Sequence, residues 1–70
     1  MLNEVLFLEA RIFAEFVRKF NIKPKEANRV FEKYGIWTYI EECYDTLHMN
    51  GDDYILNDVE HILQRKGALA

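Results

Sequence analysis

The stretch of sequence that decides the fold is NEVLFLEARIFAEFVRKF, residues 3–20. When its residues are placed at 100° intervals, the apolar side chains cover one broad arc, with Phe7, Leu8 and Ala14 at its edges. The charged side chains outside this arc form a narrow strip: Glu4, Arg11, Glu15 and Arg18. The pattern predicts a long apolar N-terminal helix. Because the polar strip is narrow, the helix must be covered on more than one side, by the rest of the chain or by a second copy.

Glu9 is the exception within the apolar arc, where it lies between Val5, Phe13 and Phe16. An unpaired carboxylate buried among such side chains would cost several kcal/mol. The interpretation that we favour is a carboxylate satisfied by a tyrosine hydroxyl, an arginine or the N-terminus of a neighbouring helix. The alternative is a functional anchor or switch.

Local signals predict where the other helices begin and end. Asn3 can cap the first helix, and Pro24 suits the first turn of a second helix because its missing N–H needs no partner there. Gly35 can adopt the left-handed conformation that ends this second helix. A third helix is predicted over residues 37–49, and an Asn-Gly turn follows it.

The C-terminal part is predicted to open with a turn and a short extended or turn segment at residues 54–56. Asn57 has the spacing of a capping box with the glutamate three residues later, so the last helix is predicted from there to about Lys66. The predicted fold is therefore all-α, a compact bundle of about four short helices. We expect residues 1–70 to form a single domain.

The composition excludes several classes of protein. Half of the residues are apolar and ten are aromatic, which argues against intrinsic disorder. A single cysteine cannot form an internal disulfide and is compatible with a reducing compartment. No apolar stretch approaches the ~20 residues that a membrane helix needs, and the N-terminus lacks the order of a signal peptide. We expect a cytoplasmic protein.

The charge is distributed unevenly around the net value of −3. Seven basic and three acidic residues give positions 11–33 a net charge of +4, whereas positions 34–64 carry seven acidic residues and no lysine or arginine. The acidic residues are Glu41, Glu42, Asp45, Asp52, Asp53, Asp58 and Glu60. An acidic surface would repel nucleic-acid phosphates and attract a basic partner.

The residues that could suggest catalysis or metal binding are Cys43, Asp45, His48 and His61. Cys43 and His48 are five positions apart, about 140° round a helix, so they form no catalytic dyad. One cysteine and two separated histidines are too few ligands for zinc. The Asn-Gly turn fails as a calcium loop because Asn57 stands where the bidentate glutamate belongs. We expect no enzymatic activity, no metal and no cofactor.

Short motifs are distributed over nearly the whole chain: FEKYG at 31–35, YI at 39–40, YDTLH at 44–48, Gly51, YI at 54–55 and DV at 58–59. In these motifs the chain resembles a family of small, helical bacterial proteins that are catalogued as a domain of unknown function. The family residues carried onto this chain are Tyr34, Gly35, Tyr39, Tyr44, Asp45, Leu47, His48, Gly51, Tyr54, Ile55 and Asp58. The resemblance gives none of them a catalytic role. Members are often encoded beside a protein that resembles ADP-ribosyltransferases, so the resemblance implies a toxin and antitoxin arrangement.

Asp45 and His48 differ from the other motif residues, most of which suit packing or turns. They are three positions apart and therefore neighbours on a helix, next to the Asn-Gly turn. We favour a pair that locks the turn over a pair that faces a ligand. An enzyme or small-ligand protein that uses this pair would need an enclosed polar pocket.

The functional hypothesis is a small helical protein-interaction module, an antitoxin-like or regulatory subunit that binds a protein partner or a second copy of itself. The expected partner-binding residues are Phe7, Leu8, Glu9, Asp45 and His48. The alternative is a transcriptional regulator of the helix-turn-helix type that binds nucleic acid through Lys25, Arg29 and Lys33. The charges argue against this alternative, because the predicted recognition helix carries Glu41, Glu42 and Asp45 and no basic residue.

Overall fold

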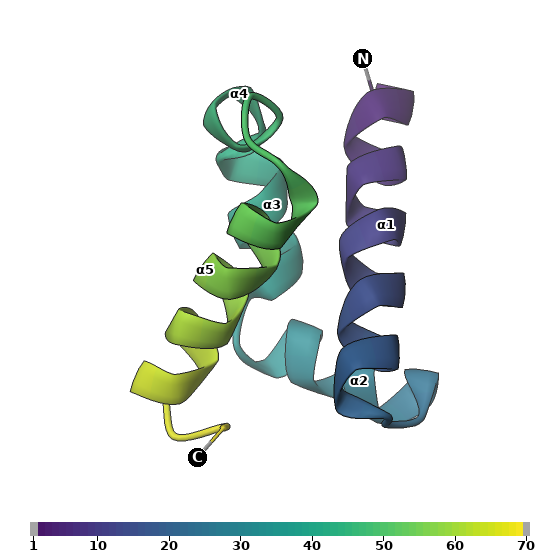
Figure 1. The fold of residues 1–70 in the computed structure, drawn as a ribbon, viewed down its shortest axis with the longest axis vertical. Coiled ribbons are helices and arrows are strands. Elements are labelled where there is room, and N and C mark those ends of the chain that lie inside the picture. Colours follow the sequence, from purple (N-terminus) through teal and green to yellow (C-terminus); the bar gives the residue numbers. More distant parts are fainter. Residues whose placement is uncertain (1, 70) are drawn as a thin grey trace.

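The structure is a computed structural model that describes residues 2–69, with side chains described from Glu4 onward. Within this range the chain forms five helices and no strand: α1 (Leu2–Phe20), α2 (Pro24–Lys33), α3 (Ile36–Glu42), α4 (Tyr44–Leu47) and α5 (Asp52–Arg65) (Figure 1). The predicted all-α class is confirmed. Because α1 already begins at Leu2, Asn3 does not precede it, and the side chain of this predicted cap lies outside the described residues.

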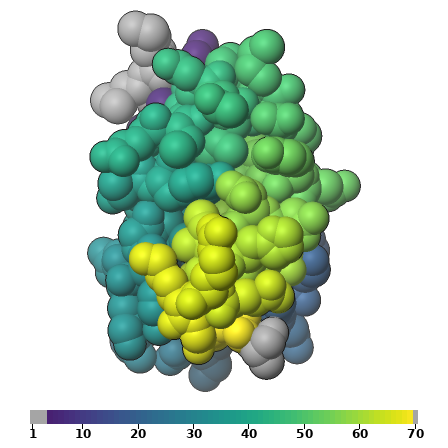
Figure 2. Space-filling view, turned by 90° about the vertical axis from the view of Figure 1, so that its left-hand side faces the viewer, coloured from purple at the N-terminus to yellow at the C-terminus, as the bar shows by residue number. Residues whose placement is uncertain are grey.

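The long helix α1 forms one side of the molecule (Figure 1). It contacts α5 and α3 along its length and α2 near its C-terminal end. The helix α2 crosses the lower end of α1, whereas α4 lies at the opposite end of the molecule, near the N-terminus (Figure 1). Figure 2 shows the molecule from the side of α5. In this view α5 and the C-terminal segment lie against the region of α2 and α3. The helices α3, α4 and α5 therefore lie on one side of α1, and α2 crosses its C-terminal end.

The predicted signals at both ends of α2 act as expected. Pro24 occupies the first turn, where its lack of an N–H costs nothing. Gly35 follows with a φ of 71°, the left-handed conformation that ends a helix and that a side chain would strain. The next residue, Ile36, is fully buried and begins α3. The turn thus directs α3 back into the core.

The predicted third helix is wrong in one respect, because it breaks at Cys43. Cys43 has a φ of −101° and a ψ of 11°, outside the α-helical range, and separates α3 from α4. Four consecutive residues of modest helix propensity meet at this point: Cys43, Tyr44, Asp45 and Thr46. The break leaves α4 as a single turn that caps the upper end of the molecule (Figure 1).

The predicted extended or turn segment at residues 54–56 is also wrong, because these residues belong to α5. The helix starts at Asp52, five residues before the predicted start at Asn57. Asp52 and Asp53 occupy its first turn, where negative charge is favourable beside the helix dipole. The buried side chains Ile55, Leu56, Val59 and Leu63 then form one stripe along the helix.

The core takes side chains from all five helices: Leu8, Ile12, Phe16, Ala27, Phe31, Ile36, Ile40, Leu47, Ile55, Leu56, Val59 and Leu63. Phe31 lies at an aromatic centre, with its ring 4.9 Å from that of Trp37, 5.1 Å from that of Phe16 and 5.3 Å from that of Phe13. These edge-on contacts join α1, α2 and α3. Among the described residues, no helix is both long and apolar enough to cross a membrane.

The buried face of α1 is not centred where the sequence pattern predicts. Leu8, at the edge of the predicted arc, is 3% exposed and forms the core stripe with Ile12 and Phe16. Leu6, within the arc, is 54% exposed, and the neighbouring Phe7 is 67% exposed. The helices α3, α4 and α5 lie on one side of α1 (Figure 1). Leu6 and Phe7 of α1 are left at the surface.

Candidate functional site

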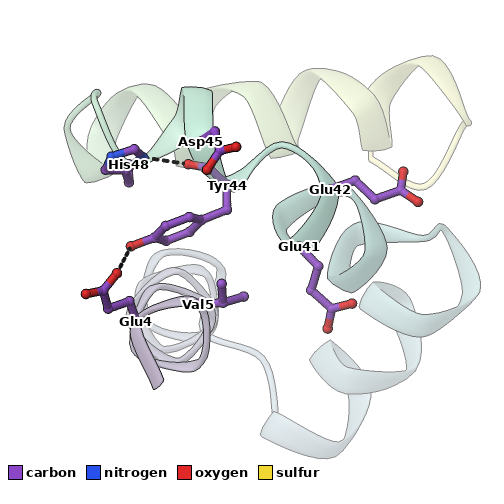
Figure 3. A pocket seen from close by; sticks show the side chains of 7 residues that line it. All are labelled: Glu4, Val5, Glu41, Glu42, Tyr44, Asp45 and His48. Atoms are coloured by element: carbon purple, nitrogen blue, oxygen red, sulfur yellow. Dashed lines mark hydrogen bonds between the residues drawn. The ribbon is translucent and has the colours of Figure 1, made fainter. Parts of the chain in front are cut away.

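An acidic hollow of about 430 Å³ lies between the N-terminal part of α1 and the α3–α4 region (Figure 3). It is lined by Glu4, Val5, Glu41, Glu42, Tyr44, Asp45 and His48. Four of these seven side chains are carboxylates, so the hollow has a negative potential.

Tyr44 is the centre of the hydrogen bonds in this hollow. Its hydroxyl donates to Glu4 Oε2 at 3.4 Å and thereby ties α4 to α1. Its ring is stacked on the His48 ring, with centroids 4.9 Å apart and planes within 9°. His48 Nδ1 donates to the backbone carbonyl of Tyr44 at 2.8 Å, because a carbonyl can only accept. Desolvation and the nearby Glu4 carboxylate raise the pKa of the Tyr44 hydroxyl.

The predicted Asp45–His48 pair is not what locks the turn. Both side chains are exposed and line the hollow, but no hydrogen bond joins them within the described chain. His48 instead binds the carbonyl of Tyr44, and the Asn50 side-chain amide donates to the carbonyl of Thr46 at 3.1 Å. The carbonyls of α4 are thus capped by His48 and Asn50, which leaves the Asp45 carboxylate toward solvent.

Glu9 lies in a second, shallower groove of about 360 Å³ between α1 and α3, lined by Leu6, Glu9, Ala10, Trp37 and Glu41. Its side chain is 6% exposed. The favoured interpretation, that a tyrosine, an arginine or a helix N-terminus satisfies the Glu9 carboxylate, is wrong for the described residues, among which no such group pairs with Glu9. The facing ionisable group is another carboxylate, that of Glu41. Burial first, and Glu41 second, raise the pKa of Glu9 to about 7.

The predicted partner-binding residues therefore fall into different parts of the molecule. Phe7 projects from the open side of α1, whereas Leu8 belongs to the core and cannot reach a partner while the chain is folded. Asp45 and His48 share the acidic hollow. Glu41, which was not among the predicted partner-binding residues, lines both this hollow and the groove that holds Glu9.

The basic residues Lys25, Arg29 and Lys33 are all exposed on α2. Arg29 Nη1 lies 3.5 Å from Glu26, and Lys33 Nζ lies 5.4 Å from the centre of the Tyr34 ring. The helix α2 is at the far end of the molecule from α4 (Figure 1). The uneven charge of the sequence thus becomes a separation in space, with a basic end and an acidic end.

Three of the four acidic residues of α5 have structural partners that the sequence did not predict. Arg11 of α1 binds Asp52 through two hydrogen bonds of 2.9 and 3.1 Å, and Lys19 Nζ lies 2.6 Å from Glu60. The Tyr39 hydroxyl of α3 donates to Asp58, and burial and that carboxylate raise the pKa of Tyr39. No local pattern links these residues, since each pair joins different helices. The acidic residues that remain toward solvent near the hollow are Glu41, Glu42 and Asp45.

Comparison with protein families identifies one match, over residues 10–66, to the family described as a protein of unknown function, DUF3791. The chain belongs to the DUF3791 family. The match starts within α1 and includes all of α2, α3, α4 and α5. Neither the curated proteins nor the solved structures contain a match.

Two pairs among the motif residues that carry the resemblance meet in the fold of this DUF3791 chain. Tyr39 and Asp58 form the hydrogen bond between α3 and α5, and Tyr44 and His48 form the stacked pair in the hollow. Within residues 2–69 no three histidine, cysteine or acidic side chains are arranged to hold a metal ion. The candidate site consists of carboxylates, one stacked aromatic pair and an apolar helix face.

Proposed function

We propose that this chain is a small helical protein-interaction module whose partner binds the open side of α1. One observation carries the proposal: Leu6 and Phe7 are 54% and 67% exposed, and the exposed Ala10 and Ala14 follow them on the same side. Exposed aromatic and aliphatic side chains that adjoin one another are typical of binding surfaces, whereas scattered ones are ordinary. An α-helix with such a face suits pairing with another helix.

The acidic hollow adds a preference for the partner's charge. Glu41, Glu42 and Asp45 lie beside the N-terminal half of α1, and they would attract a partner with lysine or arginine next to its apolar contact. The family resemblance implies an antitoxin-like or regulatory role, and the partner that we propose is an ADP-ribosyltransferase-like protein of the kind often encoded beside members of the family. We propose a binding role and not an enzymatic one, and we place the protein in the cytoplasm.

The alternative is nucleic-acid binding through Lys25, Arg29 and Lys33, which form an exposed strip on α2. In a helix-turn-helix arrangement α3 would have to enter the DNA groove. Its residues Ile36 and Ile40 are buried, and its exposed side chains include Glu41 and Glu42. The strip on α2 would therefore bind phosphates, but no recognition helix would contact the bases in the DNA groove. Salt-dependent binding of any DNA or RNA, lost in Lys25→Glu, would support this alternative.

The test of the interaction module is co-expression with the neighbouring ADP-ribosyltransferase-like protein, followed by size-exclusion chromatography with light scattering. We expect a complex that Phe7→Ser weakens at least tenfold, because this change removes the largest apolar side chain of the surface. Tyr54→Ser is the matched control, since Tyr54 is 57% exposed and lies on α5. Equal affinities for the two variants would contradict the proposal.

A further inference from the structure

The open side of α1 has a large side chain at one end and small ones beyond it. Phe7, Ala10 and Ala14 are spaced three and four residues apart, so they lie in one line along the helix. All three are exposed. A second helix could approach closely at the two alanines, whereas the large Phe7 side chain needs a small side chain opposite it on the partner.

The same side of α1 carries opposite charges near its two ends. Glu4 and Arg18 are both exposed, and 14 positions separate them, which is about 21 Å along the helix and places them on the same flank. No ion pair joins Arg18 to another of the described residues, and Glu4 accepts one long hydrogen bond, from Tyr44 at 3.4 Å. Both charges are therefore available to a partner.

Building on the proposed role of this face, we propose that a second copy of the chain covers it while no other protein partner is bound, with the two α1 helices antiparallel. A two-fold axis between residues 10 and 11 places Phe7 of each copy on Ala14 of the other. It also places Glu4 of each copy beside Arg18 of the other. Each contact occurs twice, as a two-fold interface requires.

The antiparallel arrangement is favoured over the parallel one by size and by charge. In a parallel pair Phe7 would meet Phe7 while Ala14 faced Ala14, which leaves a bulky contact and a gap on the same face. Glu4 would also meet Glu4, and Arg18 would meet Arg18. The antiparallel pair matches large with small and acidic with basic, and it opposes the two helix dipoles.

The interface would be small, because it uses one face of one helix. Leu6 extends it toward the groove at Trp37, while Arg11 stays bound to Asp52. Small interfaces form weak, concentration-dependent complexes, so we expect a dissociation constant on the order of 10–100 μM.

Sedimentation velocity of the full chain, from about 5 to 500 μM at low salt, tests the pairing. We expect the mass to rise toward that of a dimer and Phe7→Ser to weaken association at least tenfold. Glu4→Arg and Arg18→Glu should each weaken it, and the double variant Glu4→Arg/Arg18→Glu should restore it. The control is the charge reversal Arg29→Glu on α2, which should leave the association unchanged. Circular dichroism verifies that each variant is folded.

Cysteine cross-linking tests the orientation, in a Cys43→Ser background. Ala10→Cys should form a disulfide dimer because it lies next to the two-fold axis, whereas Ala14→Cys alone should not. Cross-linking of both would indicate a parallel pair and overturn the proposal. A monomer at every concentration would overturn it too. If such a monomer still bound another protein through Phe7, the proposed function would stand and only the dimer would be rejected. If the chain neither self-associated nor bound another protein, both proposals would be rejected.

Discussion

The helix α1 meets its two main neighbours in opposite ways. Toward α5 it presents Arg11 and Lys19, which bind Asp52 and Glu60. Toward α3 it presents Glu9, which faces Glu41 in a groove beside Trp37. The first interface joins unlike charges at the surface, whereas the second holds like charges near the core. This fold tolerates an unfavourable pair because apolar packing fixes α1 against both neighbours.

If apolar packing is the common support, Ile12→Ala should have the largest effect of the changes considered. Ile12 is fully buried in the middle of α1, so its truncation leaves a cavity. We expect a loss of about 2–5 kcal/mol in the free energy of unfolding, measured by urea denaturation at low protein concentration. Leu6→Ala is the control, because Leu6 lies on the same helix but is 54% exposed and should cost less than about 1 kcal/mol. Similar losses would mean that the outer face of α1 is also buried in solution.

Glu9→Gln should have the next largest effect, and its sign is stabilising. The pKa of Glu9 is about 7 in the folded chain, above the ordinary value of 4.5, so ionisation opposes folding. The contribution of Glu9 to stability is therefore greatest below pH 4.5 and is lost as the pH rises through 7. At pH 8.5 we expect Glu9→Gln to raise the free energy of unfolding by up to about 3 kcal/mol, and at pH 4 to change it little.

The control for Glu9→Gln is Glu42→Gln on the exposed side of α3. It removes the same charge from the same region without relieving a buried carboxylate. Glu41→Gln should reproduce part of the gain, because it removes the like charge that faces Glu9. If Glu9→Gln raised the free energy of unfolding equally at pH 4 and pH 8.5, the carboxylate pair would not titrate as a buried group.

The parts of the fold that were predictable depend on local signals. Pro24 and Gly35 define α2 because proline and glycine act through their own backbone conformations. The same kind of signal misled at Asp52 and Asp53, which were interpreted as a turn although acidic residues are also favourable in a first helical turn. The break at Cys43 was missed because a modest propensity is a weak signal when the apolar spacing is continuous.

The candidate site was less predictable, because its contacts join distant parts of the chain. Glu9 was recognised as unusual from α1 alone, but its neighbour Glu41 lies on α3, and no spacing rule connects the two. Leu8 was misplaced for a related reason. A helix that is apolar over a broad arc does not reveal which part of that arc the other helices will cover. The exposure of Phe7 follows from that choice of side, which only the packing of α3 and α5 determines.

The unlike pair between α1 and α5 should give the smallest effect, and one that salt removes. Arg11 holds the pKa of Asp52 below its ordinary value, so this pair adds stability above the unfolded pKa of Asp52 and loses it as the pH falls through the folded one. At pH 7 we expect Asp52→Asn to cost about 1 kcal/mol or less, because the pair is partly exposed.

Asp53→Asn is the matched control, since it removes a charge from the same first turn of α5. If both variants lost equal stability, the helix dipole and not Arg11 would account for the effect. A larger loss in Asp52→Asn that 1 M salt abolishes would assign it to the ion pair. Acid would then act on the two sides of α1 in opposite directions, relieving Glu9 first and weakening Asp52 only at lower pH.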